Sequence, residues 1–256
     1  MRYLFGFLCS CALGLAPLVG CGETTGDGGS GGSAGTGGSA GTGGTGGDGV
    51  TATVIVHASG FEPPQGTTGP LEGVQVCETG TTNCVMTGAD GIGELELPVD
   101  QETSVTLDKE GRGSYLHSVI IPAEGAIVTQ GLALDARLED MYGRVMSPYP
   151  PEGAGTAFVD LRNVAGATFE LVGTTGKAFY RDEELNWSLD FTATTSDGTG
   201  GFVEVSPGVV QIDIGGTADN CVLVRGWPGD SENSARMLVR EGYFSHVTLE
   251  CDEVVP

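Results

Sequence analysis

The side chains that could perform acid–base or metal chemistry are few in this sequence and lie far apart. Its three histidines are His57, His117 and His246, each within an apolar, β-branched run, and no His-Glu-x-x-His motif is present. An enzyme site would need a base, a nucleophile or a metal cluster with matching partners. The histidines are therefore expected to be structural or solvent-facing, and we predict no catalytic residue, no cofactor and no metal site.

Three short motifs resemble catalytic or phosphate-binding loops without the context that such loops need. Residues 31–35 and 37–41 both follow the Gly-x-Ser-x-Gly pattern of the serine-hydrolase elbow. That elbow joins a strand to a helix, and neither can form in the surrounding Gly/Ser-rich composition. Residues 173–178 resemble part of a phosphate loop, but Leu171 replaces its leading glycine and Ala178 replaces its Ser or Thr.

Two groups of side chains toward the C-terminus could bind a ligand. Asp219, Asn220 and residues 230–233 offer oxygen atoms that suit Ca²⁺, although they lack the regular spacing of a calcium loop. Trp187 and Trp227 could stack on sugar rings or contact a protein partner. Packing over the core is the favoured alternative for both, because tryptophan is usually mostly buried.

The N-terminus carries a secretion signal over residues 1–20. Arg2 precedes an apolar run over residues 3–19, which ends in Gly20 and Cys21. A basic residue, an apolar run and then Leu-Val-Gly-Cys resemble the lipobox of bacterial lipoproteins. That resemblance implies cleavage after residue 20, a diacylglycerol thioether on Cys21 and an amino terminus acylated with a chain such as palmitate. With Gly22 next, it also implies sorting to the outer membrane of a Gram-negative envelope.

Composition agrees with an exported, lipid-anchored chain. An uncleaved membrane helix fits poorly, because the apolar run is short and contains Gly6, Gly14 and Pro17. The 11 Lys+Arg and 34 Asp+Glu give a net charge of −23, which disfavours binding to nucleic acid and to anionic headgroups. Membrane attachment is therefore expected through the acyl chains. Residues 21–49, mostly glycine after the cysteine, are predicted to be a disordered tether spanning roughly 30 Å root-mean-square.

From Val50 onward, short β-branched and aromatic runs alternate with polar residues and end at Gly, Pro or Asp. Period-two alternation at this spacing predicts an all-β fold of antiparallel β-sandwiches. Helical periodicity is nearly absent, with one or two turns at most over residues 232–239. The expected strands cover residues 51–57, 73–77, 94–97, 104–107, 115–121, 157–161, 167–172, 189–194, 202–205, 209–214 and 246–250.

Four short patterns occur twice in the same order, which indicates an internal repeat. Residues 63–66 match 150–153, 71–76 match 164–169, 87–93 match 194–200, and 109–111 match 240–242. The spacing is wider in the second copy, so we expect insertions at about residues 171–190 and 215–236. The simplest division is two tandem β-sandwich domains, residues 50–138 and 139–256.

The repeated motifs also resemble a known family. Gly143-Arg144-Val145, Ala165-Gly166-Ala167, a Thr-x-x-Asp-Gly turn at 194–198 and Glu-Gly-Tyr at 241–243 are similar to carboxypeptidase regulatory-like domains. In the first copy the resemblance covers residues 51–122. It implies transthyretin-like or Ig-like β-sandwiches, which are common in bacterial surface proteins. The Asp-Gly pairs at 90–91 and 197–198 suit hairpin turns and need no catalytic role.

Four cysteines remain after the signal and Cys21, namely Cys77, Cys84, Cys221 and Cys251. An even number in an exported chain predicts two disulfides. Of the three possible connectivities, Cys77–Cys84 with Cys221–Cys251 is favoured, because each pair then lies within one proposed domain. A zinc site is disfavoured, because six residues separate the first pair and no histidine is near it.

These observations favour a lipid-anchored, non-enzymatic binding or scaffold module of the cell envelope. Its partners would be the membrane, through the lipid anchor, and an envelope protein or polysaccharide. The alternatives are a hydrolase of envelope polymers with its site in the two insertions, and a carbohydrate-binding module that uses Trp187 or Trp227. A cleft between the insertions that gathers an Asp/Glu pair, or a His with an acid, would favour the hydrolase.

Overall fold

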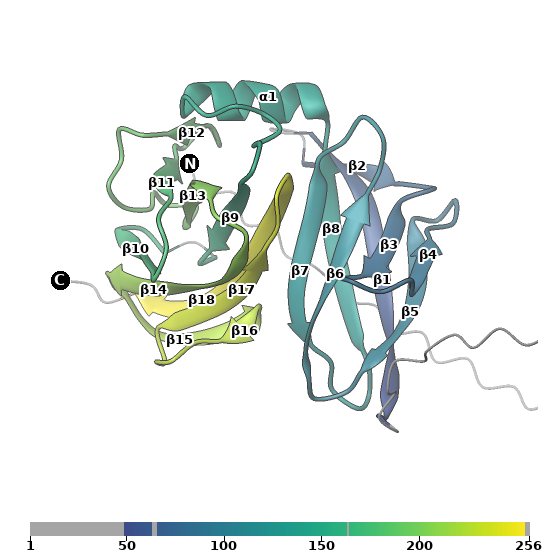
Figure 1. Cartoon of the computed structure of the whole chain (residues 1–256). Coiled ribbons are helices and arrows are strands. Elements are labelled where there is room, and N and C mark those ends of the chain that lie inside the picture. The colour runs from purple at the N-terminus through teal and green to yellow at the C-terminus, as the bar shows by residue number, and fades with distance from the viewer. Residues whose placement is uncertain (1–48, 63–65, 163, 254–256) are drawn as a thin grey trace, which may run out of the picture. The chain divides into compact units, whose positions relative to one another are not determined.

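The computed structural model describes residues 49–62, 66–162 and 164–253. The signal sequence, Cys21 and the Gly-rich tether lie outside these residues. Within them the fold is almost entirely β, as the alternating pattern predicts, with eighteen strands and a single helix (Figure 1). The described residues all belong to one compact unit.

The first half of this unit is a β-sandwich. One layer contains β1 (Thr51–Glu62), β2 (Gly66–Pro70), β5 (Ile92–Pro98) and β8 (Ala126–Ala133), and β8 runs parallel to β1. The facing layer contains β3 (Gln75–Glu78), β4 (Cys84–Met86), β6 (Glu102–Asp108) and β7 (Ser114–Ile120). Every second side chain of β1 is buried between the layers, as the period of a strand requires: Ala52, Val54, Val56 and Ala58.

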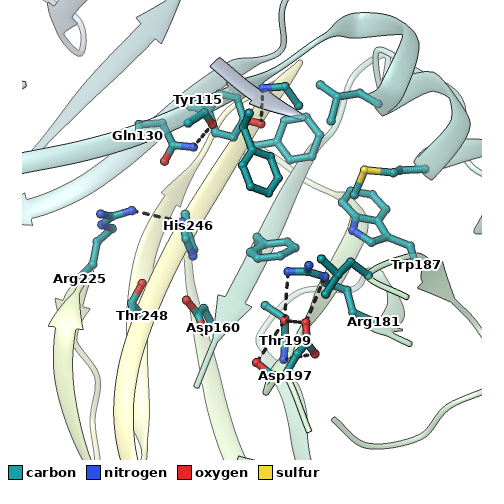
Figure 2. Close-up of a pocket in the computed structure, with 18 of the residues that line it drawn as sticks. Tyr115, Gln130, Asp160, Arg181, Trp187, Asp197, Thr199, Arg225, His246 and Thr248 are labelled. Atoms are coloured by element: carbon teal, nitrogen blue, oxygen red, sulfur yellow. Dashed lines mark hydrogen bonds and ion pairs between the residues drawn. The ribbon is translucent and has the colours of Figure 1, made fainter. Parts of the chain in front are cut away.

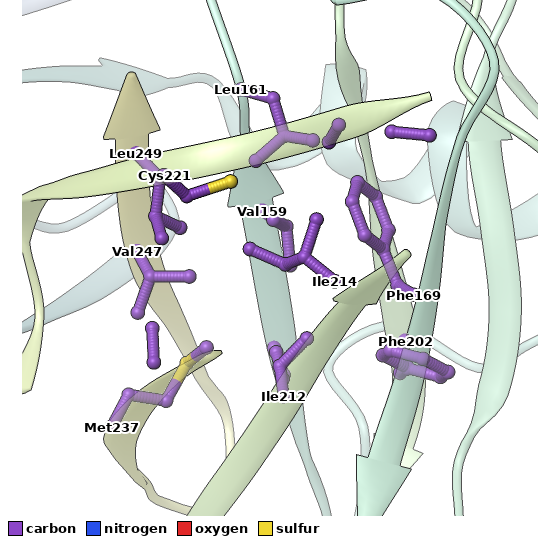
Figure 3. Close-up of a cluster of buried hydrophobic side chains, with 14 of the residues drawn as sticks. Val159, Leu161, Phe169, Phe202, Ile212, Ile214, Cys221, Met237, Val247 and Leu249 are labelled. Atoms are coloured by element: carbon purple, nitrogen blue, oxygen red, sulfur yellow. The ribbon is translucent and has the colours of Figure 1, made fainter. Parts of the chain in front are cut away.

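The second half forms a second sandwich. Its first layer contains β9 (Gly155–Asp160), β11 (Lys177–Arg181), β12 (Trp187–Ser188), β13 (Thr199–Val205), β15 (Ala218–Arg225) and β18 (Tyr243–Glu253). The facing layer contains β10 (Ala167–Val172), β14 (Gly208–Gly216), β16 (Trp227–Pro228) and β17 (Ser234–Val239). Apolar side chains of β9 and β18 pack with Ile212 and Ile214 of β14 in the core between these layers (Figure 3).

One sheet runs through both halves, because β7 and β18 pair in parallel, with His246 opposite His117. The resulting 10-stranded sheet has the order β12-β11-β13-β9-β18-β7-β6-β3-β4, with β15 also on β18. A split into two separate domains is therefore not confirmed, although two sandwich layers can be traced in each half. The proposed boundary between residues 138 and 139 falls inside the helix α1 (Asp135–Arg144).

Helix α1 is absent from the sequence prediction. Leu138 and Tyr142, four residues apart, face inward and are buried, while Asp135 and Arg144 place charges that suit the two ends of the helix dipole. Gly143-Arg144-Val145, expected to open a strand, instead ends this helix. The helical turns expected over residues 232–239 are also wrong, because most of that segment is β17, and residues 189–194 form bends rather than a strand.

Two of the four repeated motifs occupy equivalent places in the two halves. The hydroxyl of Thr87 bonds to two backbone groups of residues 71–76, and that of Thr194 bonds to the matching groups of residues 164–169. In each case the hydroxyl accepts an N–H at 2.9 Å and donates to a carbonyl at 2.6 Å. Asp90 and Asp197 each accept the backbone N–H two residues later and precede a glycine with a φ of 74°. The Asp-Gly pairs are therefore matching turns, which is the structural role that the sequence indicated.

The other two matches are wrong as structural equivalents. Residues 109–111 lead into β7, and residues 240–242 lead into β18. The strand of the first half that corresponds to β18 is β8, not β7, because β8 runs parallel to β1 and β18 runs parallel to β9, and β1 and β9 are the first strands of their halves. Residues 150–153 precede β9, whereas 63–66 come after β1 in the sequence, and 63–65 of these lie outside the described residues. The segments 171–190 and 215–236, expected as insertions, supply β11, β12, β15 and β16 and widen both layers of the second half.

Both predicted disulfides are present. Cys77 of β3 is bonded to Cys84, which lies directly opposite it on β4. Cys221 of β15 is bonded to Cys251 of β18. Each disulfide therefore joins two neighbouring strands of the same half.

Candidate functional site

A cavity of about 540 Å³ lies where the two halves meet. It opens on the face of β9 and β18 that points away from the core of the second half, and β8, the edge strand of the first half, forms one side (Figure 2). Helix α1 and residues of both expected insertions complete the lining. The lining residues are Phe61, Tyr115, Thr129, Gln130, Gly131, Ala133, Leu138, Met141, Phe158, Asp160, Arg162, Arg181, Leu185, Trp187, Asp197, Thr199, Arg225, Phe244, His246 and Thr248.

Strand alternation explains why β9 supplies both core and cavity side chains. Ala157, Val159 and Leu161 point into the core of the second half. Phe158 and Asp160, between them, therefore point to the opposite face and line the cavity. Strand β18 follows the same rule, with its core residues alternating with Phe244, His246 and Thr248 in the cavity.

Sheet register places four of these polar side chains side by side. Thr199 is opposite Asp160, Asp160 is opposite Thr248, and Thr248 is opposite Arg225, on strands β13, β9, β18 and β15. We call Thr199, Asp160, Thr248 and Arg225 the polar row. Figure 2 shows Arg225 and Asp160 on opposite sides of Thr248 and His246.

Aromatic rings line the neighbouring part of the cavity. Phe158 meets the ring of His246 edge-on, with centroids 5.2 Å apart, and Phe244 stacks on Tyr115 at 5.3 Å. Trp187 lies 6.0 Å from Phe244 and 6.3 Å from Phe158. We call Tyr115, Phe158, Trp187 and Phe244 the aromatic wall. The cavity therefore has an apolar end and a polar end, which is typical of small-molecule sites.

Arg225 brings a positive charge to the polar row and forms no ion pair with any described residue. Its Nη1 donates to Nδ1 of His246 at 3.3 Å, and its Nη2 donates to the carbonyl of Thr129 at 3.1 Å. Among the described residues no carboxylate lies within 4.0 Å of it. Burial accordingly lowers the pKa of Arg225 from its usual value, with nearby Asp160 opposing that shift.

His246 is neutral in this setting. Burial, and then the charges of Arg225 and Arg181, lower its pKa to about 3. A guanidinium group can only donate, so Nδ1 of His246 is the acceptor and its proton is on Nε2. That Nε2 is buried and has no hydrogen-bond partner among the described residues.

The two carboxylates of the cavity differ in their surroundings. Asp197 forms an ion pair with Arg181 at 3.2 Å and also contacts the hydroxyl of Thr199. Asp160 accepts the backbone N–H of Arg162 at 2.9 Å but forms no ion pair with any described residue. Burial raises the pKa of Asp160, only partly offset by that hydrogen bond and by the nearby arginines.

The cavity holds more unsatisfied donors than acceptors. Besides Nε2–H of His246, the indole N–H of Trp187 is buried and has no partner in the described part of the chain. A buried polar group without a partner costs about 1–3 kcal/mol, so such groups usually meet a water or a ligand. Both belong to residues that line the cavity.

The two tryptophans singled out in the sequence have different positions. Trp187 is 2% exposed and belongs to the aromatic wall. Trp227 is 6% exposed and lies outside the cavity, with its N–H donating to the carbonyls of Thr103 and Val119, each at 3.1 Å. Burial of both rings favours the packing role that the sequence also indicated. Among the residues described, no three His, Cys, Asp or Glu side chains gather as a metal site, around Asp219 or elsewhere.

Sequence analysis did not single out Asp160, Arg225 or His246 as a group. Their positions are 65 and 21 residues apart, and only the pairing of β9, β18 and β15 brings them together. A usable signal was the polar or aromatic residue at every second position of the segments 157–161 and 246–250. The expectation for His246 is a structural or solvent-facing side chain, whereas this residue lines the cavity.

Comparison with known proteins gives matches among solved structures but none among family models or curated proteins. Among solved structures, it is similar to the Bacillus anthracis TIE protein, with 14% identity and a TM-score of 0.26 over 80% of this chain and 34% of that one. It is also similar to GBS52, the minor pilin of Streptococcus agalactiae, with 11% identity and a TM-score of 0.25 over 80% of this chain and 97% of that one. The chain thus spans about a third of the length of the TIE protein. Similarity at this level does not extend to what either protein does.

Proposed function

We propose that this protein is a lipid-anchored, non-enzymatic binding module of a bacterial cell envelope, and that its ligand occupies the cavity between the two halves. The observation that carries the binding role is the cavity itself, with an aromatic wall, a polar row and two unsatisfied buried donors. Its volume of about 540 Å³ is within the range of small-molecule sites. Strands and a helix form most of its lining, so the side chains are held in place before a ligand arrives.

The anchor rests on the resemblance of residues 18–21 to a lipobox. Within the described residues, no helix is both long and apolar enough to cross a bilayer. Acyl chains on Cys21 would hold the protein at the membrane, and the glycine-rich tether would let the β-sandwiches reach away from the headgroups. The resemblance to carboxypeptidase regulatory-like domains fits the same location.

Replacing Cys21 with alanine should release the protein from the membrane fraction or leave it as an unprocessed precursor. The reason is that the thioether cannot form without the sulfur. Membrane fractionation and the intact mass of the protein measure this. Replacing Ser33 with alanine in the tether is the matched control, and it should leave the membrane fraction unchanged and lower the mass only by the oxygen atom that the substitution removes. If Cys21→Ala left the membrane fraction unchanged and lowered the mass only by its sulfur atom, lipidation at this residue would be ruled out.

Filling the cavity should abolish ligand capture. Thr129 is exposed on β8 and lines the cavity, so Thr129→Trp places a large ring across it without disturbing a core. Ile127, two residues earlier on the same strand, is 68% exposed and does not line the cavity, so Ile127→Trp is the matched control. The anchored protein is purified from detergent-solubilised envelope, and retained small molecules and glycans are identified by mass spectrometry. We expect a retained component with wild type and Ile127→Trp, and at least about tenfold less with Thr129→Trp. Equal retention by all three would place binding outside the cavity.

One observation favours the hydrolase as a second candidate. Asp160 and Asp197 line a cavity to which both expected insertions contribute, and burial raises the pKa of Asp160 as a general acid requires. Asp197, however, performs the same turn-forming role as Asp90, which is not among the cavity residues. The carboxylate of Asp160 likewise accepts the backbone N–H of the residue two positions later, Arg162. Local structure thus explains the positions of both carboxylates, which is why we prefer the binding role.

A further inference from the structure

Two opposite charges in the polar row lack an ion-pair partner. Neither Arg225 nor Asp160 lies within 4.0 Å of an opposite charge among the described residues. They are not neighbours, because Thr248 stands between them in register. Adjacent strands are about 4.8 Å apart, so the Cα atoms of Arg225 and Asp160 are roughly 10 Å apart. The two charges therefore face the same cavity and leave space for a ligand group between them.

The donors around Arg225 suit a carboxylate. Arg225 uses two of its five N–H donors, on His246 and Thr129. The free Nε2–H of His246 and the hydroxyl of Thr248 lie next to it on the same sheet face. Three arginines and two aspartates line the cavity, so its lining has a net positive charge in a chain whose net charge is −23. An anionic group is therefore favoured here and repelled over most of the surface.

Asp160 adds a second requirement. A ligand with only a carboxylate would leave Asp160 unpaired and would bring a second negative charge close to it. A cationic group on the ligand would pair with Asp160 and remove that repulsion. The aromatic wall then offers apolar surface for the rest of the ligand, with Phe158 directly beside Asp160 on the cavity face of β9.

We propose that the cavity binds a zwitterion of the α-amino-acid type with a bulky apolar side chain, either free or at the end of a short peptide. Its carboxylate contacts Arg225 and Nε2–H of His246, its ammonium group contacts Asp160, and its side chain packs on the aromatic wall. This inference names the ligand class of the proposed binding site and rests on that proposed function.

The test uses matched ligands on the full-length protein. Calorimetric titration compares L-phenylalanine, D-phenylalanine and Phe-Phe with 3-phenylpropionate, which lacks the ammonium group, and phenethylamine, which lacks the carboxylate. We expect at least one of the zwitterions to bind at least about tenfold more tightly than both single-charge analogues, because each analogue leaves one half-buried charge unpaired. This comparison needs no variant, so it stands even if a variant misfolds.

Protein variants then assign each charge to its residue. Arg225→Gln should weaken the zwitterion and 3-phenylpropionate by about tenfold or more and leave phenethylamine within about threefold. Asp160→Asn should weaken the zwitterion and phenethylamine but leave 3-phenylpropionate unchanged or stronger. Arg144→Gln is the matched control, because this arginine pairs with Asp140 on helix α1 and does not line the cavity, and it should change each affinity by less than about threefold.

Two results would overturn the inference. One is the absence of zwitterion binding at millimolar concentration, and the other is zwitterion binding that Arg225→Gln and Asp160→Asn leave unchanged. If the envelope component is still captured in a Thr129-dependent way, for example an uncharged sugar, the ligand class is wrong and the proposed function stands. If neither zwitterion nor envelope component depends on the cavity, the proposed function falls as well.

Discussion

Acidification from pH 7 to about pH 4.5 should lower the free energy of unfolding by about 3–5 kcal/mol through two buried histidines. His117 is fully buried on β7, and burial, followed by the charges of Arg225 and His246, holds its pKa well below the usual value. Burial and two arginines lower the pKa of His246 to about 3. The two rings face each other across the β7–β18 pair, with centroids 6.4 Å apart.

The direction follows from where protons bind. The ordinary pKa of a histidine side chain is 6.5, so both imidazoles become protonated below that pH in the unfolded chain. In the folded chain both stay neutral to a much lower pH, because their pKa values are lowered, to about 3 for His246. Protons therefore favour the unfolded state, by up to about 1.4 kcal/mol per pH unit for each histidine. Asp160 acts in the opposite direction, because burial raises its pKa and the folded state takes up that proton first.

Two variants show how much His117 contributes to the slope of the free energy of unfolding against pH. Urea unfolding between pH 4.5 and pH 7.5 should show a shallower slope for His117→Leu, which replaces a buried polar ring with an apolar side chain. The slope should decrease by nearly the value for one bound proton, which is about 1.4 kcal/mol per pH unit. His57→Gln, an exposed site on β1, is the matched control and should leave the slope unchanged. Parallel curves for wild type and His117→Leu would contradict a buried neutral histidine.

The strands could largely be predicted from local pattern, because a buried face imposes a period of two. The segment 51–58 alternates apolar and polar side chains, and β1 forms there. Strand β8 was not predicted, because Gln130 and Gly131 interrupt its apolar pattern and Gln130 is buried all the same. Its partner in the sheet, β1, lies about 70 residues earlier, so the pairing is not a local property of the sequence.

Helix α1 and the cavity could not be predicted for a related reason. The apolar face of α1 is only Leu138 and Tyr142, which a short helix can bury because aromatic rings from both halves surround it. The polar row depends on the register of four strands that are distant in sequence. A shift of β18 by one residue would point the side chain of Thr248 into the core and remove it from the polar row. Disulfide pairing was predictable because each pair of cysteines belongs to one half.

The double change Cys221→Ala, Cys251→Ala should lower the free energy of unfolding by about 3–4 kcal/mol. This disulfide closes a loop with a sequence separation of 30, and a longer loop restricts the unfolded chain more. Cys77→Ala, Cys84→Ala is the natural comparison, because its separation is only 7 and the same relation gives about 2–2.5 kcal/mol. Urea unfolding of both variants at pH 7, without reductant, measures the two losses.

The longer disulfide also bears on the cavity. Strand β15 pairs with β18 through two register shifts, one on each side of the Val222–Leu223 pairs, which interrupt the ladder. Cys221 lies within the first of these shifts, so its bond to Cys251 holds β15 where the ladder is weakest. Arg225 follows on the same strand. Without the bond, amide hydrogen exchange should accelerate over β15, and the affinity of the cavity for the proposed zwitterion should fall even where the protein remains folded. The Cys77–Cys84 variant should lose stability without either effect, since β3 and β4 do not line the cavity. If both variants lost equal stability and β15 exchanged at the wild-type rate, the disulfide would have no part in positioning Arg225.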